Sequence, residues 1–296
     1  MKKAFSFLSL ILLFIPFVRA EECGLLNLAS CIPQKMYDFF INLINAPISP
    51  LLVLVKSLLT DSMQLTIFSS LWAIMVYIIS LFYGFLLLYS GFTFILSGYD
   101  APKREKAKEW LRNIVVMIVL VQASYFIYAL VLDMNSLMTS GVMNLINEEF
   151  FKLTADNIVN IGLEFFFAFG YVAILLITAL ILTIRYLIVV AGVAIVPFGI
   201  FLFFIPPLKN YGQFILNFLG SCIFITFFDA IIFLFSSKLL EIPLFENVKI
   251  LVMISAFCMA NLLMLYVLFF SAFKAALNFT DKATGMIILA TKYFVK

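Results

Sequence analysis

The sequence predicts an all-α fold: a polytopic transmembrane helix bundle of about five spans after a signal peptide, with a long or broken central helix. The 296 residues are 65% hydrophobic and only 12% charged, whereas soluble domains carry roughly 25% charged residues. The mean hydropathy is +1.16, and several apolar runs exceed the roughly 18 residues that indicate a transmembrane helix. We therefore expect a multi-pass protein of the cell membrane, with lipid as its first partner.

The composition also limits the chemistry. The chain has no His, which is the commonest general base and metal ligand. Its four Cys lack the CxxC spacing of zinc and redox sites. The sequence contains no phosphate-binding loop and no catalytic triad. We therefore expect no enzymatic activity and no metal or cofactor, so that energy for any transport must come from a partner or a gradient.

Residues 1–20 have the three parts of a secretory signal peptide. Lys2 and Lys3 form the positive start, residues 4–18 the apolar core, and a small-residue cleavage pattern ends at Ala20. The core is shorter than the roughly 20 residues of a span, which favours cleavage over an uncleaved first helix. The mature N-terminus should then lie outside the cytoplasm.

Residues 21–65 are predicted to form an extracytoplasmic amphipathic segment. Pro47 and Pro50 divide it into two apolar stretches that are each too short to span. We expect two helices that lie on the outer membrane surface or pack against the bundle. Cys23 and Cys31 could close a small disulfide loop in this oxidising compartment.

The transmembrane bundle is predicted over residues 66–271. Its first two spans, 66–96 and 111–132, enclose the most basic loop of the chain, which the positive-inside rule places in the cytoplasm. The polar, acidic loop 133–160 then lies outside and should meet protein partners rather than DNA phosphates. The basic loop could contact DNA or a cytoplasmic partner, although an interaction with anionic lipid is the simpler interpretation. Its candidate contact residues are Lys103, Arg104, Lys106, Lys108 and Arg112.

The longest apolar run covers residues 161–219. Arg185 is its only ionised side chain between Phe165 and Ile205. We predict one span from Ile161 to about Arg185, then a broken or re-entrant segment, because Gly and Pro interrupt helices there. The predicted helix-break residues are Gly192, Pro197, Pro206 and Pro207.

Two further spans, 213–235 and 250–270, precede a basic amphipathic tail at 272–296. If the long run crosses the membrane once, the chain has five spans and a cytoplasmic tail. If it crosses twice, there are six spans and the tail lies outside. The five-span topology is favoured because it keeps Lys209 and the four tail lysines in the cytoplasm.

Three ionisable residues, Glu164, Arg185 and Asp229, lie inside predicted spans and are therefore candidate functional residues. Glu164 is near a span end, Arg185 can extend to the cytoplasmic surface, and Asp229 needs a partner. In the six-span topology Arg185 and Asp229 would lie at a similar depth in the membrane and could form an ion pair. In the five-span topology they would lie apart. For each of these three residues the simpler interpretation is structural: an ion pair or a side chain extended to the membrane surface that holds the helix bundle together.

Four features of the second half together resemble the TrbL-type polytopic inner-membrane subunit of type IV secretion and conjugation systems, including its archaeal DNA-import relatives. They are Arg185, the Pro197-Phe198 pair, the turn from Ile205 to Lys209, and the span start from Gly212 to Gly220. The resemblance covers about residues 66–270 and rests on hydropathy. The chain has one Lys209 where bacterial members often have several basic residues. Residues 66–132 also resemble a two-helix conjugative pilin hairpin.

This resemblance implies a membrane channel or platform subunit that moves DNA or protein together with pilin-like subunits and a cytoplasmic ATPase, in contact with single-stranded DNA. Five spans are too few to enclose a DNA-wide pore, so we expect a homo-oligomer. Two other functions fit the sequence. One is a small-molecule or ion transporter that uses Asp229 and Arg185, and the other is a purely structural scaffold.

Overall fold

The computed structural model describes residues 28–61, 63–151, 161–246 and 248–270. The predicted signal peptide at 1–20, the basic tail at 272–296 and Cys23 lie outside the described residues. The side chains of Cys31 and Glu164 are also outside them, so the disulfide and the role of Glu164 stay predictions.

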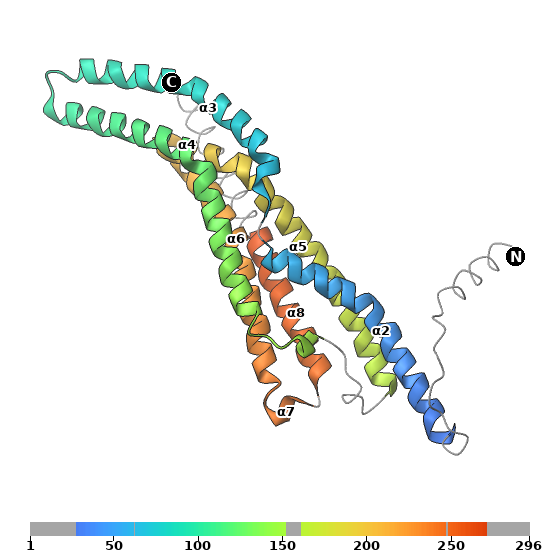
Figure 1. The fold of residues 1–296 in the computed structure, drawn as a ribbon. Coiled ribbons are helices and arrows are strands. Elements are labelled where there is room, and N and C mark those ends of the chain that lie inside the picture. The colour runs from blue at the N-terminus through green and yellow to red at the C-terminus, as the bar shows by residue number, and fades with distance from the viewer. Residues whose placement is uncertain (1–27, 62, 152–160, 247, 271–296) are drawn as a thin grey trace, which may run out of the picture. The chain divides into compact units, whose positions relative to one another are not determined.

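The described secondary structure is entirely helical, which confirms the all-α prediction (Figure 1). The helices are α2 (Leu28–Thr60), α3 (Ser69–Leu96), α4 (Ala101–Met143), α5 (Ile161–Phe204), α6 (Lys209–Leu239), α7 (Pro243–Glu246) and α8 (Lys249–Leu265). Short turns are η1 (Leu65–Phe68), η2 (Glu148–Phe151), η4 (Pro206–Leu208) and the π-helical η5 (Tyr266–Phe270).

Five helical segments of the described chain are long and apolar enough to cross a membrane, which confirms the predicted polytopic bundle of five spans. They are Leu65–Leu96, Ala101–Met143, Phe166–Phe204, Pro206–Leu239 and Lys249–Phe270. All five belong to one compact unit, Asn45–Lys296, while Met1–Ile44 form a separate unit. The chain is therefore a multi-pass membrane protein.

Helix α2 differs from the two helices expected for residues 21–65. It continues through Pro47 and Pro50 without a break. Each proline removes one backbone donor and disfavours a helix by about 3 kcal/mol. Ile48 is buried after the first proline, and packing of an apolar face usually decides whether a helix persists.

The predicted break of the central run at Gly192 and Pro197 is wrong, because α5 is one continuous helix of 44 residues with Pro197 inside it. Pro197 cannot donate a hydrogen bond to the carbonyl of Val193. Membrane helices tolerate this loss where neighbouring helices enclose the site, and Val193 and Val196 are both buried. The helix does end at the Pro206 turn, as predicted.

The glycines of this region allow close helix packing rather than a break. A Cβ atom on Gly212 of α6 would lie 2.6 Å from the carbonyl oxygen of Gly199 and still nearer to the Phe203 nitrogen on α5. A Cβ atom on Gly192 would lie 2.9 Å from Leu219 and would overlap the Tyr128 hydroxyl. Small residues let membrane helices approach each other in this way.

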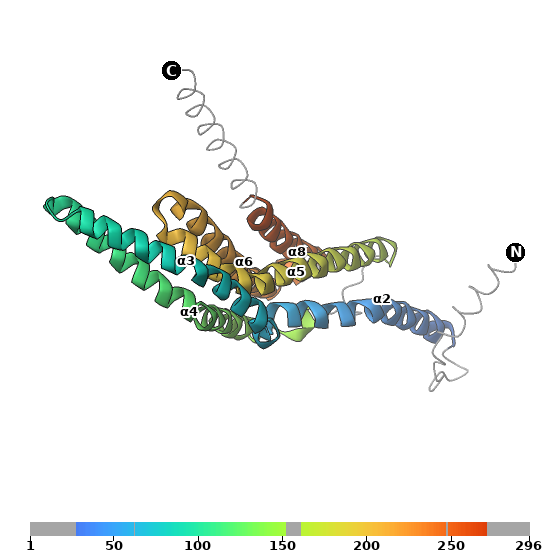
Figure 2. The same cartoon turned by 90° about the horizontal axis from the view of Figure 1, so that it is seen from above.

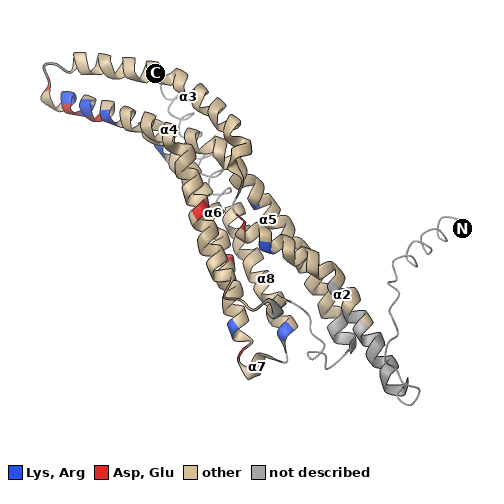
Figure 3. Cartoon of the chain, in the orientation of Figure 1, with Lys and Arg blue, Asp and Glu red and all other residues tan. Residues whose placement is uncertain are grey.

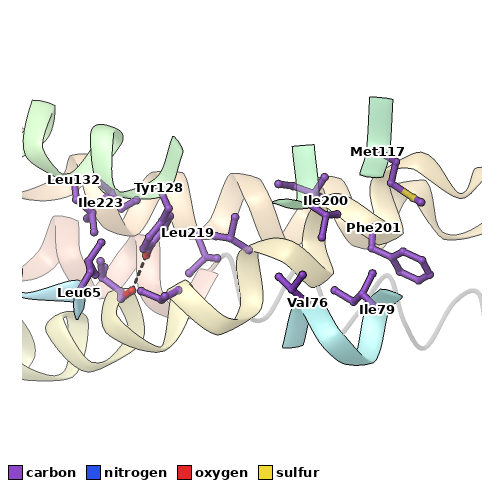
Figure 4. Packing of buried hydrophobic residues seen from close by; sticks show 14 of the residues in the cluster. Leu65, Val76, Ile79, Met117, Tyr128, Leu132, Ile200, Phe201, Leu219 and Ile223 are labelled. Atoms are coloured by element: carbon purple, nitrogen blue, oxygen red, sulfur yellow. Dashed lines mark hydrogen bonds between the residues drawn. The ribbon is translucent and has the colours of Figure 1, made fainter. Parts of the chain in front are cut away.

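The apolar core lies between α3, α4, α5 and α6, and Figure 4 shows part of it. In a bilayer the lipid is as apolar as the side chains, so helices associate mainly through packing and polar contacts. Two residues on facing helices, Val121 and Val189, are fully buried. The interior of this part of the bundle is therefore filled by side chains.

Helices α3 and α4 form an antiparallel hairpin and lie side by side in both views (Figures 1 and 2). The Trp72 indole donates a hydrogen bond to the Ser124 hydroxyl at 2.9 Å. Further along the hairpin, the rings of Tyr89 and Trp110 meet edge to face, with centroids 6.4 Å apart. The first contact joins the start of α3 to the middle of α4, and the second holds the end of α3 beside the first turns of α4.

Candidate functional site

A layer of buried polar side chains crosses the bundle between α4, α5, α6 and α8. Its two ionisable members are Arg185, which is 2% exposed, and Asp229, which is 0% exposed. The predicted extension of Arg185 to the membrane surface is therefore wrong. Arg185 is directed inward because α6 offers it hydrogen-bond acceptors. The uncharged members of the layer are Asn135, Thr139, Thr178, Thr226 and Asn261.

Arg185 fixes α5 against α6 through three hydrogen bonds. Its Nε donates to the Cys222 carbonyl at 2.8 Å, and its Nη2 donates to the Ile223 carbonyl at 3.0 Å. The same nitrogen lies 3.4 Å from the Thr226 hydroxyl. The three acceptors lie within about one turn of α6, between Cys222 and Thr226. Hydrogen bonds donated by a charged guanidinium group are stronger than those between two neutral groups.

Thr226 connects three helices at this level. Its hydroxyl accepts a hydrogen bond from Asn135 Nδ2 of α4 at 2.9 Å and donates to the Ile223 carbonyl at 3.2 Å. Together with the contact from Arg185, this joins α4, α5 and α6 around one hydroxyl group. Such interhelical hydrogen bonds take the place of the hydrophobic effect inside a bilayer.

Asp229 lies one turn beyond Thr226 on the same face of α6 and interacts electrostatically with Arg185. The ion pairs found among the described residues do not join these two side chains. The expectation that five spans would keep Arg185 and Asp229 apart is wrong. The antiparallel hairpin of α5 and α6 brings them to similar depth without a sixth span.

A second polar contact joins α5 to α8. Asn261 Nδ2 donates to the Thr178 hydroxyl at 3.0 Å, and this hydroxyl donates to the Ile174 carbonyl at 2.8 Å. Next to this contact, the rings of Phe233 on α6 and Phe257 on α8 pack with their centroids 4.7 Å apart. Asp229 precedes Phe233 by four residues and Asn261 follows Phe257 by four, so both lie one turn from the same aromatic pair.

A hydrogen bond from Tyr128 of α4 to α5 shows which residues of these two helices lie at the same level. Its hydroxyl donates to the Val189 carbonyl at 2.6 Å (Figure 4). Helical carbonyls already accept one bond from their own helix, so this is an additional contact between two spans. It lies directly beside Gly192, whose missing side chain leaves room for the tyrosine ring.

Replacing Tyr128 with Phe is expected to lower the free energy of unfolding by about 1 kcal/mol, because it removes one net hydrogen bond and leaves the packing intact. Thermal unfolding in detergent, followed by size-exclusion fluorescence, measures the change. The exposed Tyr77 of α3 provides the matched Tyr→Phe control and should leave the unfolding temperature unchanged. Equal shifts for the two variants would contradict the role of the Val189 bond.

The predicted basic contact residues Lys103, Arg104, Lys106, Lys108 and Arg112 all lie in the first three turns of α4, near the end of the α3–α4 hairpin (Figure 3). They are exposed. Lys103 is 3.0 Å from Asp100, and Arg112 is 3.9 Å from Glu109. Arg112, the basic residue nearest to the layer along α4, precedes Asn135 by 23 residues, roughly 35 Å along the helix. The basic segment and the buried polar layer are therefore separate sites.

The five uncharged members of the polar layer were not predicted from the sequence. Three of them show a signal in their spacing: Asn135 and Thr139 are four residues apart, and Thr226 lies three residues before Asp229. The predicted loop 133–160 begins too early, because α4 continues to Met143 and includes Asn135 and Thr139. Residues at these spacings share one face of a helix. A search for polar pairs at helical spacing would have found both faces.

The described residues contain no group of three or more His, Cys, Asp or Glu side chains that could hold a metal ion. Cys222 is a buried free thiol and Cys258 an exposed one. Comparison of the chain with models of protein families, with curated proteins and with solved structures finds no match.

Proposed function

We propose that this protein is a channel or platform subunit of a type IV secretion-like machine, similar to the TrbL-type subunits, that moves DNA or protein across the cell membrane. The observation that carries the proposal is the α3–α4 hairpin, whose exposed basic segment lies at one end of an apolar bundle. The long α5, its Pro206-Pro207 turn and the closely packed α6 also agree with the family's pattern.

In this function the basic segment lies in the cytoplasm, the mature N-terminus outside and the C-terminus inside. The positive-inside rule favours this orientation. Lys103, Arg104, Lys106 and Lys108 would then contact the cytoplasmic ATPase or the phosphates of single-stranded DNA. Because all four are exposed, they can bind without unfolding any part of α4. Pilin-like subunits would be the partners within the membrane.

A homo-oligomer is part of this proposal. The core between α3 and α6 is filled by side chains such as Val121, Leu182 and Val189, all fully buried. A cargo as wide as a DNA strand therefore needs a path between subunits rather than through this core. A native mass measurement in nanodiscs would test the oligomer, and a monomer that supports transfer would contradict it.

Neutralising the basic segment tests the function directly. We expect the combined change of Lys103, Arg104, Lys106 and Lys108 to Gln to lower transfer of labelled DNA roughly tenfold or more, because phosphate binding depends on the number of positive contacts. Protein level in the membrane should not change. The matched control replaces the three lysines with Arg and keeps Arg104, so the charge is retained. Normal transfer by the Gln variant would contradict the proposal.

An ion transporter is the second candidate, and the burial of Asp229 favours it. Carboxylates inside membrane spans often mark an ion pathway. The two functions differ in what Asp229→Asn should change. Loss of ion flux with intact assembly and normal DNA transfer would favour the transporter, whereas loss of DNA transfer in the basic-segment variant alone would favour the secretion subunit.

A further inference from the structure

Five buried side-chain oxygen atoms in the polar layer have no hydrogen-bond partner among the residues that the structure describes. They are both carboxylate oxygens of Asp229, the amide oxygens of Asn135 and Asn261, and the hydroxyl oxygen of Thr139. All four residues are more than nine-tenths buried. A buried polar atom without a partner is costly, and each one in a folded protein needs an explanation.

Three of these residues, Asn135, Thr139 and Asp229, are brought together by α4 and α6. Asn135 is bonded to Thr226, and the two helices are parallel because each is antiparallel to α5. One turn further along each helix lie Thr139 and Asp229. Residues one turn apart on one face are neighbours, so Thr139 and Asp229 lie at the same level of the bundle, one turn beyond the Asn135–Thr226 bond.

The fourth residue, Asn261, reaches the same level from α8. The Tyr128–Val189 bond sets the register of α4 against α5. Thr139 lies eleven residues after Tyr128 on α4, and Thr178 lies eleven residues before Val189 on the antiparallel α5. Thr139 and Thr178 are therefore at the same level, and Asn261 is bonded to Thr178. Asp229 and Asn261 also both lie one turn from the packed rings of Phe233 and Phe257. Three helices therefore direct oxygen atoms into one layer.

A set made only of oxygen atoms is the ligand type that hard cations prefer. One carboxylate with neutral amide and hydroxyl groups supplies a single negative charge, which suits a monovalent cation. A proton on Asp229 would satisfy one carboxylate oxygen and could donate to only one other atom. A cation can be coordinated by several of these oxygens at once.

Arg185 does not fill this position. Its guanidinium group is bonded to the carbonyls of Cys222 and Ile223, which lie seven and six residues before Asp229, respectively. The positive charge of Arg185 therefore acts on Asp229 from a distance and leaves the carboxylate oxygens free. The same charge opposes a divalent ion more strongly than a monovalent one.

We propose that Asp229, Asn135, Thr139 and Asn261 bind one dehydrated monovalent cation, for which Na⁺ is the probe. This site is independent of the proposed secretion function, because it is built from the buried layer and not from the basic segment. In a secretion subunit the ion would stabilise the contact of α4, α6 and α8. In a transporter it would be the coupling ion.

Binding of radioactive sodium to the full-length protein in nanodiscs tests the site, with ionic strength held constant by a large organic cation. We expect saturable binding of one sodium ion per chain and its loss in Asp229→Asn. Thr139→Val should weaken binding roughly tenfold, the effect of losing one polar contact. Glu241→Gln, which removes an exposed carboxylate at the end of α6, is the matched control and should bind normally.

Three results would overturn the proposal. The first is the absence of saturable sodium binding to the unaltered protein. The second is binding that Asp229→Asn and Thr139→Val leave unchanged. The third is sodium-independent uptake of one proton per chain on acidification that Asp229→Asn abolishes, since this would make Asp229 a proton site. If Asp229→Asn fails to fold, the Thr139→Val measurement decides, because it adds no charge and nearly preserves volume.

Discussion

Replacing Gly212 with Ala is expected to prevent normal packing of α5 against α6. The added Cβ atom would lie 2.6 Å from the Gly199 carbonyl oxygen and nearer still to the Phe203 nitrogen. Both are backbone atoms, which cannot rotate away as a side chain can. Overpacking usually costs about 1–3 kcal/mol, and we expect at least the upper end of this range. The unfolding temperature in detergent and the folded yield measure the effect.

Gly220 provides the matched control on the same helix. A Cβ atom there would have no neighbour within 4 Å. Gly220→Ala should therefore be neutral or more stable by about 0.5–1 kcal/mol, because Ala favours a helix over Gly. Equal behaviour of the two variants would mean that α5 and α6 do not approach as closely as described, and the account of their hairpin would be wrong.

Replacing Arg185 with Leu is expected to destabilise the protein by about 3–5 kcal/mol in sodium-free buffer, because it leaves the Asp229 carboxylate buried without a counter-charge. It also removes the bonds that join α5 to the carbonyls of Cys222 and Ile223. The measurement is equilibrium unfolding in mixed micelles. Arg112→Gln, which changes an exposed arginine, should have little effect.

A second substitution separates the loss of charge balance from the loss of packing. We expect Asp229→Leu, added to Arg185→Leu, to restore much of the stability, because removing both buried charges leaves neither of them without a counter-charge. The double-mutant cycle gives the coupling energy between the two sites. Strictly additive effects would show that Arg185 and Asp229 act independently.

The transmembrane spans could be predicted from the sequence because a bilayer imposes a minimum apolar length. The run from Leu65 to Leu96 and the span that ends at Phe270 satisfy it without any knowledge of neighbours. The end of α5 at Pro206-Pro207 was also predictable, since consecutive prolines cannot continue a helix from within.

The continuity of α5 could not be predicted. Whether Pro197 breaks a membrane helix depends on what encloses the freed Val193 carbonyl, and that is decided by tertiary packing. Gly192 is a second residue whose role depends on tertiary packing. Its lack of a side chain makes room for the Tyr128 hydroxyl of α4, a residue 64 positions away, whereas the local sequence indicates only a weak point in the helix.

The direction of the Arg185 side chain also depends on residues far away in the sequence, because its acceptors are 37 and 38 residues from it. A long side chain in a span can extend to the interface or turn inward, and the sequence around residue 185 is apolar in both directions. The Arg185 side chain turns inward because the Cys222 and Ile223 carbonyls accept its hydrogen bonds. Asn135 was overlooked because it lies in the stretch 133–160 that was predicted to be a loop, whereas α4 continues to Met143. Asn261 was overlooked because a single amide in an apolar helix gives no signal until its partner on another helix is known.

Labelling of single cysteine reporters in intact cells is the most direct test of the account, which places a five-span bundle with its basic hairpin end in the cytoplasm. The reporters replace Lys106, Leu145 and Lys282 in a chain without its natural cysteines. We expect a membrane-impermeant thiol reagent to label position 145 alone, with positions 106 and 282 protected until the membrane is opened. Labelling of position 282 in intact cells would mean an even number of spans and would contradict the topology. Labelling of position 106 would place the basic segment outside, where it could not meet a cytoplasmic ATPase.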